Sequence, residues 1–206
     1  MIFSAIWSFD KVMPLKIYLN QVHNNILMNK NRCSWVNLDE DIYVRYHDEE
    51  WGIATHDDRE LFEMLVLESF QAGLSWITIL KKRENFKKAF DDFDVEKVAC
   101  YDEDKVEELR QNEGIIRHKG KIASAINNAQ IFIEIQNEFG SFDSYIWGFT
   151  DGNVIKSEYL TESELSKEIS KDLKKRGMKF VGPTIIYSYL ESIGIIDNHQ
   201  EDCFKY

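Results

Sequence analysis

The stretch KRGMKFVGPTI, residues 175–185, places two glycines in a short turn between two predicted helices. Gly177 ends the first helix, and Gly182 followed by Pro183 opens the second, because proline is favoured in the first helical turn. A glycine turn that leads into a helix N-terminus presents unpaired backbone N–H groups, which suit a phosphate oxygen. We therefore interpret this stretch as a helix-hairpin-helix element.

A second glycine turn and clustered basic residues accompany the first. GIIRHKGKI, residues 114–122, has the same character, although glycine turns between helices are common. The formal net charge is −11, yet residues 81–88, 117–121 and 171–179 carry +4, +3 and +4, so the remainder holds −22. Positive charge gathered in few places favours one phosphate-binding face. Each window alone could instead be a solvated helix face.

Helical periodicity dominates the chain, and alternation typical of strands is nearly absent. Asp57 and Ser75 are suitable N-caps, and Thr161-x-x-Glu164 has the spacing of a capping box. The helices that these signals predict cover residues 57–71, 76–90, 102–111, 119–139, 161–177 and 183–194. The sequence therefore predicts an all-α fold.

Length and composition predict one domain, or two small lobes, without membrane or secretory features. The 206 residues are 44% hydrophobic, which is enough for one sizeable core. Three cysteines, an odd number, argue against a disulfide framework and for a reducing compartment. No apolar run approaches the roughly 20 residues needed to span a bilayer. We expect a cytoplasmic protein with no membrane contact.

Two pairs of potential metal ligands stand at opposite ends of the sequence. Cys33 and His47 lie near the start, and His199 and Cys203 near the end. Two thiolates and two imidazoles fill the four positions of a tetrahedral Zn²⁺, which leaves no position for a catalytic water. Such an ion would close a loop of about 170 residues. By spacing alone the four residues could equally be unrelated.

A set of motifs gives the chain a family resemblance. RYHDEEWG (45–52), LESFQAGLSWITILKKRENF (67–86) and the two glycine turns occur in the order seen in the 3-methyladenine DNA glycosylase I family. The resemblance runs from about Arg32 to Cys203. It implies a helix-hairpin-helix glycosylase fold with one structural zinc per chain, held by the four Cys and His residues named above and tying the N- and C-terminal segments together.

The resemblance also implies a base pocket. Glu68 matches the carboxylate that hydrogen-bonds a methylated adenine, and we assign it as the catalytic candidate while expecting recognition to dominate. Trp76 matches the aromatic residue that stacks on the flipped base, Tyr43 and Tyr46 match tyrosines of the pocket wall, and Trp35 completes it. Without the resemblance, Trp76 would be read as a core residue, Glu68 as a solvated helix edge, and the tyrosines as a packed pair.

Function follows from the same resemblance. We expect a monofunctional enzyme of base-excision repair that acts as a monomer on alkylated double-stranded DNA and releases 3-methyladenine by hydrolysis. Lys175, Arg176, Lys179 and Gly182 are then expected to contact the DNA backbone. No lysine stands in the pocket motifs, so a Schiff-base step is not expected. One alternative is a DNA-binding module without catalysis, and the intact pocket motif argues against it. Another is a helical interaction protein that binds no nucleic acid, which would explain the acidity but leave the basic windows and the aromatic residues unexplained.

The chain departs from the family at its beginning. Family members start a few residues before the first zinc ligand, whereas about 30 residues precede Cys33 here. We expect residues 1–27 to be an extension, either an artefact of the start codon or an extra helix, and residues 28–206 to form a single glycosylase domain.

Overall fold

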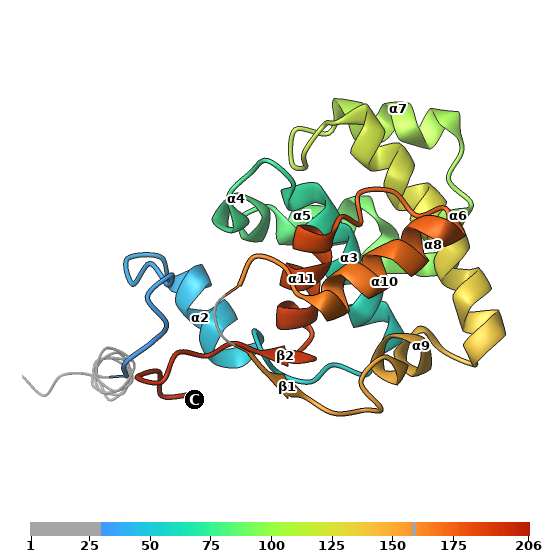
Figure 1. The fold of residues 1–206 in the computed structure, drawn as a ribbon. Coiled ribbons are helices and arrows are strands. Elements are labelled where there is room, and N and C mark those ends of the chain that lie inside the picture. The colour runs from blue at the N-terminus through green and yellow to red at the C-terminus, as the bar shows by residue number, and fades with distance from the viewer. Residues whose placement is uncertain (1–29, 158–159) are drawn as a thin grey trace, which may run out of the picture.

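The computed structural model describes residues 30–157 and 160–206, so the predicted extension at residues 1–27 lies outside the described part. The fold is mostly helical, as predicted, and a single pair of two-residue strands accompanies the helices (Figure 1). The elements are α2 (Asp41–Glu49), α3 (Asp58–Gln71), α4 (Trp76–Leu80), α5 (Arg83–Ala89), the 3-10 helix η1 (Asp91–Phe93), α6 (Val95–Ala99), α7 (Glu103–Gln111), α8 (Lys119–Phe139), α9 (Phe142–Gly148), β1 (Ile155–Lys156), α10 (Glu164–Arg176), α11 (Pro183–Ser192) and β2 (Ile196–Asp197).

Local capping signals set several helix boundaries where they were predicted. The Asp57 carboxylate accepts hydrogen bonds from the first-turn amides of α3, at 2.9 and 3.1 Å. Asp102 caps α7 in the same way. Helix α8 covers the predicted range, and Gly140 follows it in the left-handed conformation that glycine adopts without strain.

Two local predictions were wrong. The helix expected over residues 76–90 is two helices, because the Lys82 amide bonds the Ile79 carbonyl in a tight turn that breaks the α-helical ladder. The capping box of α10 uses Ser163 and Ser166, not Thr161 and Glu164. The two serines satisfy each other's backbone amides reciprocally, at 2.9 and 3.1 Å, so the helix begins two residues later than the predicted cap.

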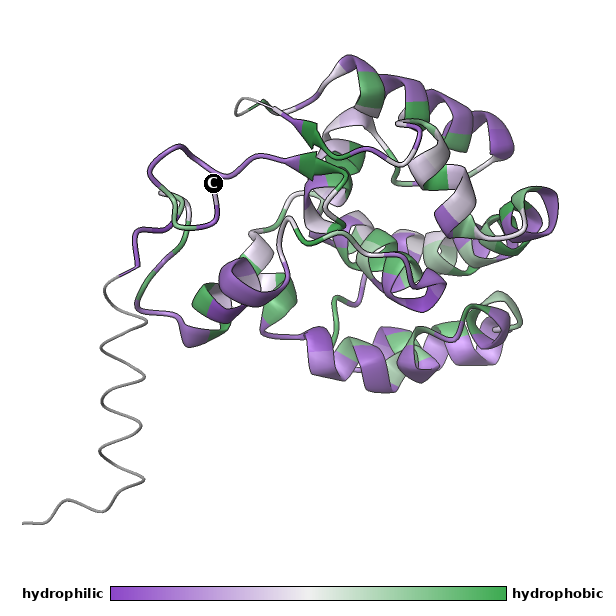
Figure 2. Ribbon diagram, turned by 90° about the horizontal axis from the view of Figure 1, so that it is seen from below, coloured by the Kyte–Doolittle hydropathy of each residue, from purple (hydrophilic) through white to green (hydrophobic). Residues whose placement is uncertain are grey.

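Helix α3 is the centre of the core. Every residue from Leu61 to Phe70 is buried, since α8, α9 and α11 all pack against this helix (Figure 1). Aromatic contacts join the layers: the Phe62 ring meets Phe132 of α8 edge-on, with ring centroids 5.2 Å apart. Figure 2 shows hydrophilic residues on the outward faces of the helices. Because every face of α3 is covered along this stretch, the Glu68 side chain lies in the interior of the protein, although it belongs to a charged residue type.

The two ends of the described chain lie side by side (Figure 1). The Phe204 amide donates to the Asn31 carbonyl at 2.8 Å, and the Asn31 amide group donates to Asp202. Strand β1 pairs in parallel with β2, which brings the segment before α10 against the C-terminal segment. None of the described helices is long and apolar enough to cross a membrane.

Candidate functional site

A cavity of about 180 Å³ opens among α2, α3, α4 and α11. All five residues predicted for the pocket line it, together with four that were not predicted. The lining residues are Trp35, Tyr43, Tyr46, Trp51, Glu68, Gln71, Trp76, Ser188 and Glu191. Residues from both ends of the sequence therefore converge on one cavity, and the tertiary structure brings the predicted set together.

Aromatic rings form the walls of this cavity. The Tyr46 and Trp76 rings are tilted by 55° with centroids 5.4 Å apart. Trp35 meets Tyr43 edge-on at 5.2 Å and Trp51 edge-on at 5.0 Å. Such ring pairs hold one another in place, and the cavity between them suits a flat aromatic ligand.

Two buried polar atoms in the cavity lack a hydrogen-bond partner within the described chain. They are Oε2 of Glu68 and Nε1 of Trp76. Glu68 is 3% exposed, and its burial raises the pKa of the carboxyl well above the usual range, with repulsion from Glu191 adding to the effect. Buried polar groups are nearly always paired in folded proteins, so an unpartnered acceptor beside an unpartnered donor indicates a ligand site.

Sequence reasoning missed four lining residues, and helical spacing from a predicted pocket residue could have found one of them, Gln71. Gln71 lies three positions after Glu68 on α3, and Glu191 lies three positions after Ser188 on α11. Residues three apart share a helix face, so the neighbours of one pocket residue on its helix are candidates for the next. Trp51 lies in the quoted RYHDEEWG motif but was given no role.

The structure gathers three of the four predicted metal ligands. The ligand atoms of Cys33, His47 and Cys203 lie within 4.8 Å of one another, and all three residues are buried. The Cys203 sulfur is 3.4 Å from Nε2 of His47. His199 stands beside this group, with its ring centroid 5.4 Å from that of His47. Residues 198–206, which carry His199 and Cys203, form turns and irregular chain with no helix.

The surroundings of these residues fit a metal ion. Nε2 of His199 is buried without a partner in the described chain, while Nδ1 pairs with Asp197 at 2.8 Å; Nδ1 of His47 pairs with Asp48 at 2.9 Å. A carboxylate on one ring nitrogen leaves the other free to bind a metal. Burial raises the pKa of the Cys33 thiol to about 12, so a nearby cation is needed to hold a thiolate there.

The hairpin between α10 and α11 is held by side chains of the surrounding helices. The side-chain amide of Asn128, on α8, makes two hydrogen bonds to the backbone of Lys179. It accepts from the backbone N–H and donates to the backbone carbonyl, both at 2.8 Å. Ser170 donates to the Val181 carbonyl at 2.6 Å. Gly182 is the N-cap of α11 and makes no side-chain cap, so the first amides of this helix are open to a ligand.

Comparison with known proteins identifies the family. The methyladenine glycosylase family model matches residues 35–206. The chain belongs to the methyladenine glycosylase family. It is 45% identical over 181 residues to DNA-3-methyladenine glycosylase 1 of Escherichia coli K12, an alignment that covers 85% of this chain and 96% of that protein.

Solved structures of the family agree with the fold. A crystal structure of 3-methyladenine DNA glycosylase I matches with a TM-score of 0.82 and 44% identity, and the match covers 84% of this chain and 98% of that chain. A structure on 3-methyladenine recognition by the Staphylococcus aureus enzyme matches with a TM-score of 0.81 and 37% identity, covering 85% of this chain and 96% of that one.

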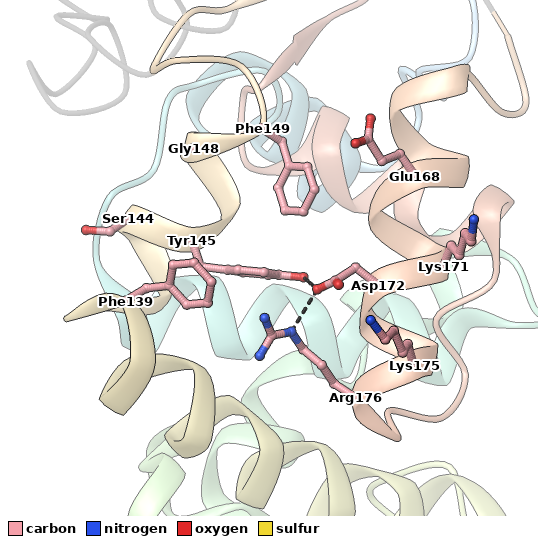
Figure 3. A pocket seen from close by; sticks show the side chains of 10 residues that line it. All are labelled: Phe139, Ser144, Tyr145, Gly148, Phe149, Glu168, Lys171, Asp172, Lys175 and Arg176. Atoms are coloured by element: carbon pink, nitrogen blue, oxygen red, sulfur yellow. Dashed lines mark hydrogen bonds and ion pairs between the residues drawn. The ribbon is translucent and has the colours of Figure 1, made fainter.

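In this member of the family, Arg176 is already engaged within the protein. Its guanidinium pairs with Asp172 at 2.7 Å and with Glu138 at 2.6 Å, and lies over the rings of Phe139 and Tyr145. Arg176 lines a second cavity, of about 530 Å³, between the end of α8, α9 and α10. Figure 3 shows Arg176 in this cavity beside Asp172, Phe139 and Tyr145. A DNA phosphate would have to compete with two carboxylates for this side chain.

Two other basic residues of the predicted phosphate-binding face serve structural purposes. Lys121 is 6% exposed, and its ammonium donates to the carbonyls of Phe70 and Ala72 at the end of α3, at 2.8 and 2.6 Å. Arg83 pairs with Glu50 and Glu63. Lys121 and Arg83 are therefore engaged within the protein. Fewer cations than the three basic windows suggest are available for one anion-facing surface. Lys175 and Lys179 are exposed, as phosphate contacts require.

Proposed function

We propose that the protein is a DNA-3-methyladenine glycosylase that takes the damaged base out of alkylated double-stranded DNA and hydrolyses its N-glycosyl bond. The observation that carries this proposal is the aromatic cavity around the unpartnered carboxyl of Glu68. The relatives that carry the same enzyme name support it. Enzymes that act on a base within a duplex reach it by extruding the nucleotide into such a pocket.

The reaction depends more on recognition of the methylated base than on activation of the base as a leaving group. Methylation at N3 makes the purine cationic and therefore a good leaving group, so little protonation is needed. The Trp76 ring can stack on the base, which contributes about 1–3 kcal/mol, and Glu68 can accept from its exocyclic amine. Glu68 then holds the base, and water adds to the sugar. No lysine is among the described residues that line the cavity, in agreement with a monofunctional mechanism.

We propose further that the metal cluster binds one structural Zn²⁺ through Cys33, His47, His199 and Cys203. Zinc supplies a tetrahedral tie and no catalytic water when all four ligands come from protein. Its position would fasten the C-terminal segment next to α2, which carries Tyr43 and Tyr46. The ion would thereby hold one wall of the base pocket in place.

DNA contacts are proposed for the hairpin between α10 and α11. The open amides after Gly182, with the exposed Lys179 and Lys175, suit phosphate oxygens. Arg176 is retained as a secondary contact, since its two ion pairs must loosen before it can reach DNA. We expect a monomer to suffice, because one chain carries both pocket and hairpin.

Release of free 3-methyladenine from methylated duplex DNA tests the function. The native chain should release the base, whereas Trp76→Ala and Glu68→Ala should lose most of this activity while keeping their fold. Glu68→Gln should weaken binding of the free base if recognition dominates. Absence of release by folded, metal-replete protein would instead favour a DNA-binding module without catalysis.

A further inference from the structure

The base cavity contains a second carboxyl group whose role is unassigned. Glu191 lies on α11, one turn after Ser188, and lines the same cavity as Glu68 of α3. The two carboxyls are close enough to repel each other, and this repulsion adds to the effect of burial on Glu68. The cavity therefore holds two acidic groups that come from different helices.

Glu191 is held in a defined position. The buried amide of Asn198 donates from Nδ2 to Oε1 of Glu191 at 2.7 Å. The backbone carbonyl of Glu191 accepts from the Gly52 amide at 3.1 Å, which fixes the end of α11 against the loop after α2. Only one carboxylate oxygen is engaged by these contacts within the described chain, and the other remains available to an occupant of the cavity.

Neither carboxyl has a basic partner in the described part of the chain. The charged group that acts on Glu68 is Glu191, and the side chain that stabilises the ionised form of Glu191 is the neutral Asn198. Burial raises the pKa of Glu191 to about 7. Enclosed acidic groups without a counter-cation destabilise a folded protein, and they mark sites where a ligand supplies the missing charge.

We propose that Glu191 is a specificity-determining residue that acts with Glu68 to select a cationic base over a neutral one. This inference rests on the proposed function. A purine methylated at N3 and still joined to the sugar is positively charged, whereas unmodified adenine is neutral. The charge leaves the base as the N-glycosyl bond breaks, so Glu191 favours the bound substrate and does not speed the cleavage step.

A purely structural role for Glu191 makes a different prediction. If its carboxyl only fastened Asn198 and the end of α11, neutralising it would affect all ligands alike. Glu191→Gln separates the two cases, because glutamine keeps the size of the side chain and an oxygen that Asn198 can bind. Glu191→Asp keeps the charge and should keep the preference, even if the shorter chain weakens binding overall.

The test compares two free ligands by quenching of tryptophan fluorescence at pH 8, where Glu191 is ionised. One is 3,9-dimethyladeninium, whose N9 methyl replaces the sugar and keeps the purine cationic; the other is uncharged 3-methyladenine. Glu191→Gln should weaken binding of the cation by about tenfold or more and that of the neutral base less than about twofold. Glu60→Gln is the control, since Glu60 lines the neighbouring cavity and not this one.

Three results are distinguishable. Selective loss of cation binding in Glu191→Gln, with the preference for the cation retained in Glu191→Asp, supports the proposal. Equal losses for both ligands, or no loss, overturn it and leave the proposed function intact. Failure of the native chain to bind either ligand would contradict the proposed function itself. Glu191→Gln should also raise the melting temperature of the ligand-free protein, which confirms that the variant is folded.

Discussion

Lys121 is the residue whose replacement best separates a structural from a DNA-binding role for the basic windows. Its ammonium is enclosed at the end of α3 and donates to the Phe70 carbonyl at 2.8 Å and the Ala72 carbonyl at 2.6 Å. Ala72 starts the loop that leads to Trp76, so this contact also positions one wall of the base cavity. Lys121→Met keeps the length of the side chain and removes both hydrogen bonds.

The expected cost follows from these two contacts. A hydrogen bond to a charged group contributes about 1.5–3 kcal/mol, and a cation at a helix C-terminus adds a few tenths to about 1 kcal/mol. Burial of the ammonium offsets part of this gain, as the lowered pKa of Lys121 indicates. We expect a net loss of about 2 kcal/mol, or roughly 4–8 °C in melting temperature for a protein of this size.

Thermal unfolding and salt-dependent DNA binding together provide the assay. Lys119→Met is the matched control, because Lys119 lies on the same helix and its side chain is 61% exposed; its stability should change by less than about 0.5 kcal/mol. Equal stability of the two variants would refute the reasoning. A slope of log affinity against log salt reduced by about one in Lys121→Met would also refute it, since that marks a lost phosphate contact.

Three further outcomes are expected. Chelation of the metal, or Cys203→Ser, should lower the melting temperature by more than about 4 °C because the tie between the chain ends is lost; identical melting with and without chelator would argue against a bound ion. The stability of ligand-free protein should fall as pH rises from about 4.5 to about 7, because Glu191 holds a proton in the folded state that the unfolded chain has already lost. Glu191→Gln should make this fall smaller, and the part that remains is expected from the raised pKa of Glu68. Asn128→Ala should cost about 1–3 kcal/mol and weaken DNA binding through the loosened hairpin, while fluorescence titration should show unchanged affinity for free 3-methyladenine.

Local signals predicted the helices well because each depends on neighbours in the sequence. Asp57 and Asp102 bond amides two or three residues away, and Gly140 and Gly177 adopt a backbone conformation that other residues resist. The break at Lys82 was missed, since it depends on which apolar residues the rest of the protein buries. A continuous helix and two short ones have nearly the same sequence pattern.

The family motifs located the pocket residues without giving their arrangement. Glu68, Trp76 and Tyr46 were predicted from the resemblance, and the cavity contains all three. Glu191 belongs to the same cavity but lies more than a hundred residues away in a segment that reads as an ordinary helix. Its proximity to Glu68 depends on the packing of α11 against α3.

The sequence by itself determined the helical class, most helix boundaries, the family and the residue types of the candidate pocket and candidate metal site, because capping, periodicity and motif order are local properties. The tertiary structure decided which charges are free. It buries Lys121, pairs Arg176 with carboxylates, and places two acidic groups together without a basic partner among the described residues. The sequence shows which side chains are charged. The partners of a charged side chain and its access to solvent depend on long-range packing, which no local pattern encodes.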